Sequence, residues 1–276
     1  MHLKIAGKKI RLATHCGCGN ERLSAFKQEP FEEQDLLVEC AQFREHDDKR
    51  LLCSSRELFY WYETPVGFLL EAYRPRAGRP SGALEVDQSW EHAKLYGTEQ
   101  RNSCLFEGAL GEVLFRNAMI GHGGIQIHCA AVAYQGQGVL FSAPSGTGKT
   151  TQARLWMENF KASMIQGDRP VIRIEEASAL VCGTPWVGSD PLFQTIMVPV
   201  KALVFLEQAT FNKAEKIDPV LAIQYLLPRC FLPYFSEQMM EKALSVAEQI
   251  LARVPCYLLR CTPTREAAEL LYRQLF

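Results

Sequence analysis

The segment GVLFSAPSGTGKTTQARLW, residues 138–156, constrains the fold of this chain more than any other segment. It begins with the apolar residues Val139, Leu140 and Phe141, which are typical of a buried strand. Glycines then allow a tight loop, and the residues that follow suit a helix. This order of strand, loop and helix turns backbone N–H groups toward one point, where an anion would bind. We expect the anion site to be formed by Pro144, Ser145, Gly146, Thr147, Gly148, Lys149, Thr150 and Thr151.

The side chains of this loop indicate which anion it binds. Lys149 would reach the β- and γ-phosphates of a nucleotide, and Thr150 would offer its hydroxyl to Mg²⁺. The pattern therefore predicts a P-loop for ATP or GTP, with a plain glycine turn between strand and helix as the alternative. Ala143 departs from the pattern GxxxxGK[ST], because it stands at the first glycine position. Alanine is tolerated there unless the backbone must adopt a positive φ.

Composition limits the other classes of function. With 276 residues, 47% of them hydrophobic and 22% charged, the chain can bury the core of one large domain or two modest ones. Thirty basic and 31 acidic residues give a formal net charge of -1, so we expect no nucleic-acid partner and no membrane partner. No run approaches the ~18 to 20 apolar residues of a spanning helix, and residues 1–11 lack the apolar core of a signal peptide. These features predict a cytoplasmic protein.

The ten cysteines mostly stand inside apolar runs, which favours reduced core thiols over a disulfide framework. The exception is the sequence HCGCG, where His15, Cys16 and Cys18 have a spacing that could hold a metal. No second cluster of ligands accompanies it, so a turn that carries two small thiols is the favoured interpretation.

The character of the sequence changes near residue 100. Residues 1–101 contain short extended runs between charged or turn-rich pieces, which predicts a β-rich region that could bind a substrate or partner. The aromatic run at residues 59–62 is expected to pack a core rather than to stack bases. Residues 102–276 alternate apolar runs and helical periodicity, which predicts an α/β nucleotide-binding domain. In this second part we expect helices at 105–118, 149–160, 218–231, 236–254 and 264–274, and strands at 125–134, 138–143, 162–166, 170–176, 179–186, 201–208 and 255–261.

Three short sequence segments carry a resemblance to a known family. They are His128 in HCAAVAYQGQGVLF, the loop SGTGKTT, and the segment IQGDRPVIR at residues 165–173. Together they make residues 125–274 similar to the kinase domain of HPr serine kinase/phosphorylase, which is related to ATP-dependent phosphoenolpyruvate carboxykinase. The resemblance implies a mixed β-sheet P-loop kinase core of the α/β (α+β) class, use of ATP and Mg²⁺, and assembly as a homo-oligomer.

The segment IQGDRPVIR departs from the family in one respect. Relatives carry two adjacent aspartates there, whereas this chain has Asp168 alone, flanked by Gly167 and Arg169. The resemblance implies that Asp168 binds Mg²⁺ or accepts the proton of the attacking hydroxyl, and Arg169 is then available to stabilise charge on the phosphoryl group. The alternative for Asp168 is a turn or cap between two strands.

Two further side chains are candidates at the same site. The resemblance places His128 near the phosphates, where it would hold the acid or help to take the proton, although a core histidine is equally compatible with the apolar strand. Glu207 ends an apolar strand as a Walker B acid does, so it is a candidate to hold the Mg²⁺ shell, with a surface carboxylate as the favoured alternative. The segment CGTPWVGSD is expected to form a substrate loop with Asp190 near the acceptor, or a loop anchored by a buried Trp186.

Taken together, these features predict an ATP-dependent kinase. The acceptor would be a hydroxyl, most simply that of serine, in a small protein, a peptide or the free amino acid. The alternative is a nucleotide-binding regulatory protein of the same fold that has lost phosphoryl transfer, which Ala143 and the single aspartate favour.

Overall fold

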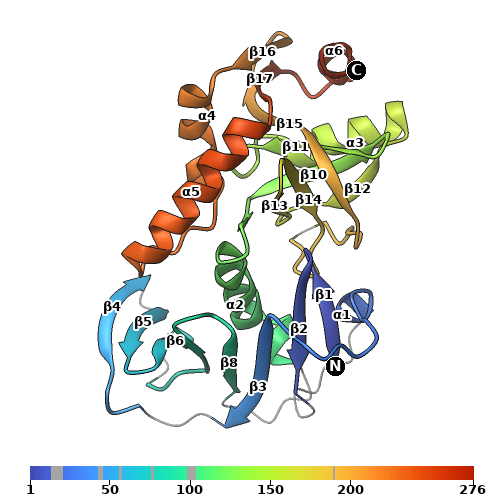
Figure 1. The fold of residues 1–276 in the computed structure, drawn as a ribbon. Helices are drawn as coiled ribbons and strands as arrows, with labels where there is room; N and C mark the ends of the chain where they lie inside the picture. The colour runs from blue at the N-terminus through green and yellow to red at the C-terminus, as the bar shows by residue number, and fades with distance from the viewer. Residues whose placement is uncertain (14–20, 43–45, 56–57, 76–77, 98–103, 189) are drawn as a thin grey trace. The chain divides into compact units, whose positions relative to one another are not determined.

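The structure is a computed structural model that describes residues 1–13, 21–42, 46–55, 58–75, 78–97, 104–188 and 190–276 (Figure 1). It forms two compact units. Unit 1 comprises Met1–His122 and Pro233–Met240, and unit 2 comprises Gly123–Leu232 and Glu241–Phe276. Unit 1 thus extends past residue 101, where the sequence predicts a boundary, and the extent of a nucleotide-binding domain stays a prediction. The candidate metal ligands His15, Cys16 and Cys18 lie outside the described residues.

Unit 1 is built on an eight-stranded mixed sheet with the order β1-β2-β3-β8-β7-β6-β5-β4. β2 and β8 both run parallel to β3, and the other neighbours are antiparallel. Its strands are β1 (His2–Ile5), β2 (Lys8–Leu12), β3 (Leu36–Gln42), β4 (Arg50–Ser55), β5 (Phe59–Thr64), β6 (Gly67–Ala72), β7 (Gly82–Asp87) and β8 (His92–Gly97). Its helices are α1 (Glu21–Ser24), the 3-10 turn η1 (Leu105–Glu107) and α2 (Ala109–Ile120).

Local sequence explains two features of unit 1, the first hairpin and the packing of its aromatic side chains. β1 and β2 alternate buried and exposed residues, and the turn between them uses positive φ angles at Ala6 and Gly7 (50° and 80°). Part of the aromatic run at 59–62 packs as expected, because Trp61 stacks on Phe235 with ring centroids 3.8 Å apart. Trp90 lies beside the same two rings and is 6% exposed.

Unit 2 is built on a nine-stranded mixed sheet. Seven strands follow the order β12-β10-β11-β15-β14-β13-β9, and β17 joins β15 while β16 joins β17. The strands are β9 (Gly124–Gln126), β10 (Cys129–Tyr134), β11 (Gln137–Ser142), β12 (Ser163–Gln166), β13 (Val171–Glu175), β14 (Ser178–Cys182), β15 (Met197–Gln208), β16 (Lys213–Ile217) and β17 (Cys256–Cys261). β15 is long enough to pair with β14 through its first residues and with β17 through its last ones.

The helices of unit 2 cover this sheet with apolar side chains. They are α3 (Lys149–Phe160), α4 (Pro219–Leu226), the 3-10 turn η2 (Leu227–Arg229), α5 (Glu237–Arg253), which begins in unit 1, and α6 (Arg265–Leu275). α3 packs on β10, β11, β12 and α6. Its Trp156 is fully buried between Phe141 and Tyr272. Asp218 caps α4 by accepting a hydrogen bond from Leu221 N at 2.8 Å, and Pro219 provides the first helical residue.

Several expected elements are confirmed, and others begin or end elsewhere. β10 and β11 form the predicted hairpin, with positive φ at Gln135 and Gly136 in its turn. The helix expected from residue 105 begins at Ala109, because Gly108 is extended. The strand expected at 125–134 is interrupted at Ile127 and His128, whose N–H groups bond to Pro170 and Arg229 instead. The strand expected at 179–186 ends at residue 182.

The structure also corrects one expectation about cysteine. Seven described cysteines are free thiols, as expected for a reduced core. Cys104 is disulfide-bonded, although the apolar context of most cysteines predicts reduced thiols.

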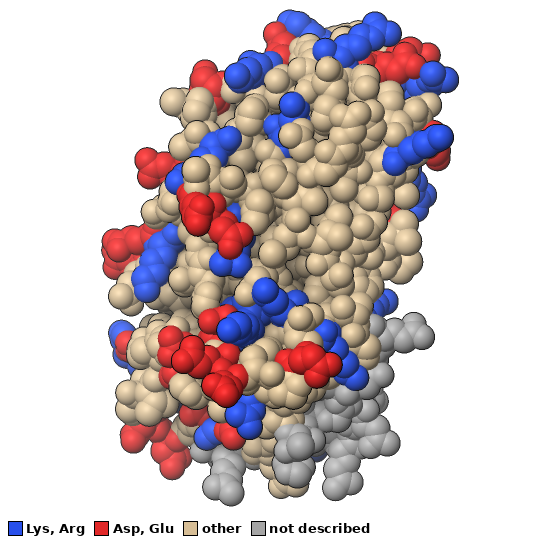
Figure 2. Space-filling view, turned by 45° about the vertical axis from the view of Figure 1, so that its right-hand side comes forward, with Lys and Arg blue, Asp and Glu red and all other residues tan. Residues whose placement is uncertain are grey.

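The surface and the helices agree with the composition. In Figure 2, basic and acidic side chains are interspersed on the face that the view shows, in keeping with a net charge of -1. Within the described ranges, no helix is both long enough and apolar enough to cross a membrane.

Candidate functional site

Strand directions bring several segments to one edge of the unit 2 sheet. β11, β15 and β17 run parallel to one another, so their carboxyl ends lie at the same edge. β10 is antiparallel to both β11 and β12, so β10 begins and β12 ends at this edge. The loop after β11 therefore lies at the same edge as the start of β10 and the ends of β12, β15 and β17. Ligands of open α/β sheets bind at such carboxyl ends.

The loop between β11 and α3 has the backbone that its glycines predict. Gly146 and Gly148 have φ angles of 78° and 116°, which side chains other than glycine rarely tolerate. Ala143 is not among the described residues with positive φ, so the missing first glycine creates no strain. Gly148 caps α3, and Gln152 N donates to its carbonyl at 2.9 Å, which starts the helix directly after the loop.

Lys149 is folded back onto the loop. Its side chain is part of a residue only 8% exposed, and Nζ donates to the carbonyl oxygens of Ala143 (3.1 Å) and Pro144 (3.3 Å). Burial lowers the pKa of Lys149 from its ordinary value, and the charge of Arg229 lowers it further, while Asp168 opposes the shift. The charges of one acid and of a second cation thus both act on this ammonium.

His128, Asp168 and Arg169 form a hydrogen-bonded group at the same edge. His128 Nε2 lies 3.1 Å from Asp168 Oδ1, and Arg169 Nε donates to Oδ2 at 2.9 Å. Backbone pairing brings His128 and Asp168 together, because Cys129 N, next to the histidine, donates to the carbonyl of Asp168 at 3.1 Å. The bond from His128 holds the pKa of Asp168 below its ordinary value, and Arg169 adds to this shift, whereas burial opposes it. Asp168 is therefore a carboxylate at neutral pH.

The segment after β14 closes over Asp168. A Cβ placed on Gly188 would lie 2.4 Å from Asp168 Oδ2, so only glycine allows this approach. Asp190 is 5% exposed, accepts from Leu192 N at 3.1 Å and pairs with Arg154 at 3.3 Å. Trp186 is buried, as the anchor alternative expects, and contact of Asp190 with an acceptor stays a prediction.

Glu207 belongs to a different group at the end of β15. Its carboxylate accepts from Tyr225 Oη at 2.7 Å and from Arg260 Nε at 2.9 Å. Arg260 also donates to Glu215 at 2.9 Å, and Lys213 pairs with Glu215 at 2.7 Å, so the charges in this group are balanced within the protein. The structure does not place a free carboxylate here, and a role for Glu207 in holding Mg²⁺ stays a prediction.

Two pockets flank the loop. The first, here called the Tyr225 pocket, has a volume of about 490 Å³, and its lining includes Ala143, Pro144, Thr147, Glu207, Tyr225 and Arg229. The second, the Pro263 pocket, has about 470 Å³, and its lining includes Gly148, Thr151, Gln152, Ala209, Cys261 and Pro263. Gln208 lines both, and its Nε2 donates to the carbonyls of Gly146 (3.4 Å) and Thr147 (3.5 Å). Its side chain therefore marks the boundary between the two pockets.

The remaining residues expected at the site lie along the loop. Pro144, Ser145 and Gly146 are exposed, Thr150 is half-buried in the first turn of α3, and Thr151 is exposed. Sequence patterns did not predict a place at the site for Gln208, which ends β15, or for Arg229, which ends η2, because the approach of these ends to the loop depends on strand order. The only local signal was their position at the ends of apolar segments.

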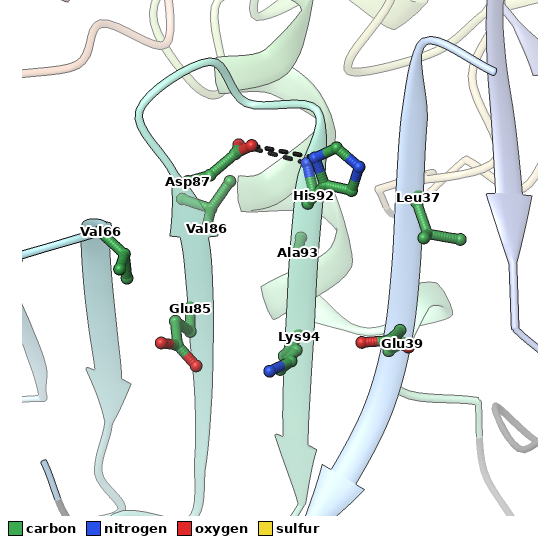
Figure 3. A pocket seen from close by; sticks show the side chains of 9 residues that line it. All are labelled: Leu37, Glu39, Val66, Glu85, Val86, Asp87, His92, Ala93 and Lys94. Atoms are coloured by element: carbon green, nitrogen blue, oxygen red, sulfur yellow. Dashed lines mark hydrogen bonds and ion pairs between the residues drawn. The ribbon is translucent and has the colours of Figure 1, made fainter.

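Unit 1 carries a smaller pocket, drawn in Figure 3, of about 170 Å³ on β3, β7 and β8. One of its three acidic residues, Asp87, is used by the protein itself. The Asp87 carboxylate accepts from Ser89 Oγ and from the N–H groups of Glu91 and His92, and it lies 3.1 Å from His92 Nδ1. These bonds close the turn between β7 and β8, so this pocket is the weaker candidate.

The fold and site define a mixed α/β protein with a glycine loop between a central strand and a helix. No family model matches the chain, and no curated protein matches it. Among solved structures, it is similar to the Hpr(Ser) kinase/phosphatase from Coxiella burnetii, with 10% identity and a TM-score of 0.32, over 54% of this chain and 95% of that chain. A likeness at this level assigns no activity.

Proposed function

We propose that unit 2 binds ATP with Mg²⁺ and transfers the γ-phosphoryl group to a hydroxyl. The acceptor is most simply serine in a small protein, a peptide or the free amino acid. The observation that carries this proposal is the convergence of the glycine loop, Lys149 and the paired His128 and Asp168 at one edge of the sheet. This edge offers donors for phosphates and, beside them, one carboxylate for an acceptor.

The two pockets suggest how the nucleotide lies. The phosphates would follow the loop from Lys149 toward the first turn of α3. Base and ribose would then occupy the Pro263 pocket, where Thr151, Ala209 and Pro263 offer small and apolar surfaces. The acceptor would enter through the Tyr225 pocket, on the other side of Gln208.

The residues of the chain then have separate tasks in the transfer. Lys149 leaves the loop carbonyls and neutralises the terminal phosphates. Asp168 orients the acceptor hydroxyl and accepts its proton as the oxygen bonds to phosphorus. The bond between the γ-phosphorus and the bridging oxygen breaks, and ADP leaves with that electron pair. His128 and Arg169 hold the carboxylate in place. Its lowered pKa makes it a weak base, which suits a loose transition state in which the proton moves late.

The oxygen atoms available at this edge fit Mg²⁺. Thr150 begins the helix after Lys149 and Asp168 offers a carboxylate, and both are the hard donors that this ion prefers. When bound, Mg²⁺ would neutralise charge on the phosphates.

One observation favours the second candidate, a nucleotide-binding regulatory protein without transfer. Asp168 is already engaged by His128 and Arg169, and the described residues place no second acid in contact with it. Such a protein would bind ATP and leave it intact.

A transfer assay separates these possibilities. Purified protein is incubated with Mg²⁺ and ATP labelled in the γ-phosphate, with free serine, serine-containing peptides or small proteins, and nucleotide binding is measured by calorimetry. Label on a serine acceptor supports the kinase. Binding without transfer or hydrolysis supports the regulatory protein, and absence of ATP binding contradicts both.

A further inference from the structure

Asn212 lies in the turn between β15 and β16, at the same edge of the unit 2 sheet as the glycine loop. Its side-chain oxygen Oδ1 accepts hydrogen bonds from Thr262 N at 2.9 Å and from Thr262 Oγ1 at 3.1 Å. Thr262 is the first residue after β17, the strand that pairs with β16 as far as Lys213 and Arg260 (Figure 1). The side chain of Asn212 therefore ties the turn after β15 to the turn after β17, beyond the last backbone pair of the two strands.

The turn after β17 is also held on its other side, at the start of α6. Thr264 is the N-cap residue of α6, and its N–H donates to the carbonyl of Thr262 at 2.9 Å. The hydroxyl oxygens of these two threonines lie 3.1 Å apart. Pro263 stands between them with the restricted φ of a proline and no N–H of its own. The position of Pro263 is thus set by Asn212 on one side and by the first turn of α6 on the other.

The two joined turns supply two apolar surfaces of the same pocket. Pro263, which is exposed, and Ala209, which is half-buried, both line the Pro263 pocket. Their backbones are fixed relative to each other, because Ala209 N donates to the carbonyl of Cys261 at 3.1 Å and Asn212 holds Thr262. A proline ring and a methyl group are surfaces against which a planar base can pack.

The amide side chains of this pocket are already used by the protein. Gln152 Nε2 donates to Cys261 Sγ at 3.5 Å, and Gln208 Nε2 donates to the carbonyl of Gly146 at 3.4 Å. Neither amide nitrogen is left over for a base in this arrangement. The affinity of the pocket for a base therefore depends mainly on packing, and packing depends on where Pro263 lies.

We propose that Asn212 is a positioning residue for the nucleotide: it holds Pro263 against the base of ATP without touching the nucleotide itself. This inference rests on the proposed function, in which the base occupies the Pro263 pocket. Without Oδ1 of Asn212, Thr262 N loses its acceptor, and the turn that carries Pro263 is free to move away from Ala209. Packing on the base then weakens, whereas the glycine loop and its contacts with the phosphates stay as they are.

The test compares a ligand that has a base with one that has only phosphates. Calorimetry with Mg²⁺ measures the binding of ATP and of inorganic triphosphate to the wild type, Asn212→Ala and Asn212→Asp. In Asn212→Ala, loss of the hydrogen bonds predicts ATP binding weaker by about 3- to 10-fold, with triphosphate binding within about twofold of wild type. Asn212→Asp keeps an acceptor oxygen and should restore most of the ATP affinity. The matched control is Asn159→Ala, which removes another asparagine whose side chain bonds to the backbone, at the carbonyl of Leu155 in α3.

Each outcome decides the inference. A loss for ATP alone in Asn212→Ala, with recovery in Asn212→Asp, supports it. Equal losses for ATP and triphosphate, or no loss for either, would overturn it, and unchanged triphosphate binding shows that a variant is folded. A wild type that binds triphosphate as tightly as ATP also overturns it, because the base then makes no favourable contact.

The proposed function fails in a different way. A wild type that binds ATP but never transfers phosphate contradicts the kinase, while the comparison of ATP with triphosphate still decides the role of Asn212. A wild type that binds neither ligand overturns both proposals.

Discussion

Two groups of charged side chains lie at the same edge of the unit 2 sheet, and they differ in how their charges are balanced. Around Glu207, the acids Glu207 and Glu215 pair with the cations Arg260 and Lys213, and Tyr225 supplies a further hydrogen bond. Around Lys149, the cations Lys149, Arg169 and Arg229 face the single carboxylate of Asp168.

The difference indicates where a ligand belongs. In the Glu207 group every charge has a partner in the protein, so the group stabilises the ends of β15, β16 and β17 without a ligand. In the Lys149 group positive charge is in excess, and an anion from solution would restore the balance. Substitutions in the first group should therefore affect folding, and substitutions in the second should affect binding and transfer.

The largest effect is expected from Lys149→Ala. Loss of the ammonium removes the charge that neutralises the terminal phosphates, so ATP turnover should fall by about 10²- to 10³-fold or more. Phosphate release and ATP binding are measured for this variant and for Lys242→Ala, which removes an exposed lysine of α5. Turnover near that of the wild type would show that the loop does not hold the phosphates.

A smaller and more selective effect is expected from Asp168→Asn. The amide keeps the size of the side chain but cannot accept the hydroxyl proton, so transfer should fall by about 10²-fold, while ATP affinity stays within a few-fold of wild type. Calorimetry and the transfer assay measure the two quantities, with Asp48→Asn as an exposed control. Parallel losses of affinity and transfer would make Asp168 a binding or folding residue instead.

In the balanced group, Glu207→Gln should hardly change nucleotide chemistry. The variant loses the pairing with Arg260, so unfolding by urea should occur at a slightly lower concentration. The dependence of ATP turnover on Mg²⁺ concentration should match the wild type within about twofold. A marked rise in the Mg²⁺ requirement would contradict the distinction between the two charged groups, because it would place Glu207 among the metal-binding residues.

The smallest effect concerns Glu215, whose pKa is lowered by a hydrogen bond from Lys213 and by the nearby Arg260, whereas burial opposes the shift. A lowered pKa in the folded state means that the carboxylate stabilises the fold above its ordinary pKa of 4.5, and that this contribution is lost as the pH falls through the folded value. Urea unfolding of the wild type and Glu215→Gln should therefore differ slightly at neutral pH and converge as the pH falls below the folded-state pKa of Glu215. A difference that persists at the lower pH would show that the charge of Glu215 is not its cause.

Local sequence predicted the elements whose signals lie within a few residues. The loop with Gly146 and Gly148, the hairpin before it and the last helix fall where composition and periodicity place them. Elements with mixed composition were harder to foresee. β16, with the sequence KAEKI, has no apolar run and forms because β17 offers it an edge.

The arrangement of the site depends on strand order, which local patterns do not contain. The pairing of His128 with Asp168 follows from the register in which Ala131 lies opposite Gln166. Arg229 reaches the loop because the turn after α4 returns to the segment before β10. Both contacts join residues far apart in the sequence, so the sequence suggested the chemistry but not the balance of charge.

The bonds from Lys149 to the carbonyls of Ala143 and Pro144 have a thermodynamic consequence. Without a ligand, the ammonium of Lys149 already donates hydrogen bonds to its own loop. Binding of a phosphate therefore replaces these hydrogen bonds with hydrogen bonds to the phosphate oxygens. Any phosphate that arrives must compete with two internal acceptors, and the measured affinity reports only the difference between the two sets of bonds. When no ligand is bound, a loop of this kind holds its lysine in a stable, buried position. The loop therefore binds an anion more weakly than the charge of the lysine alone would suggest.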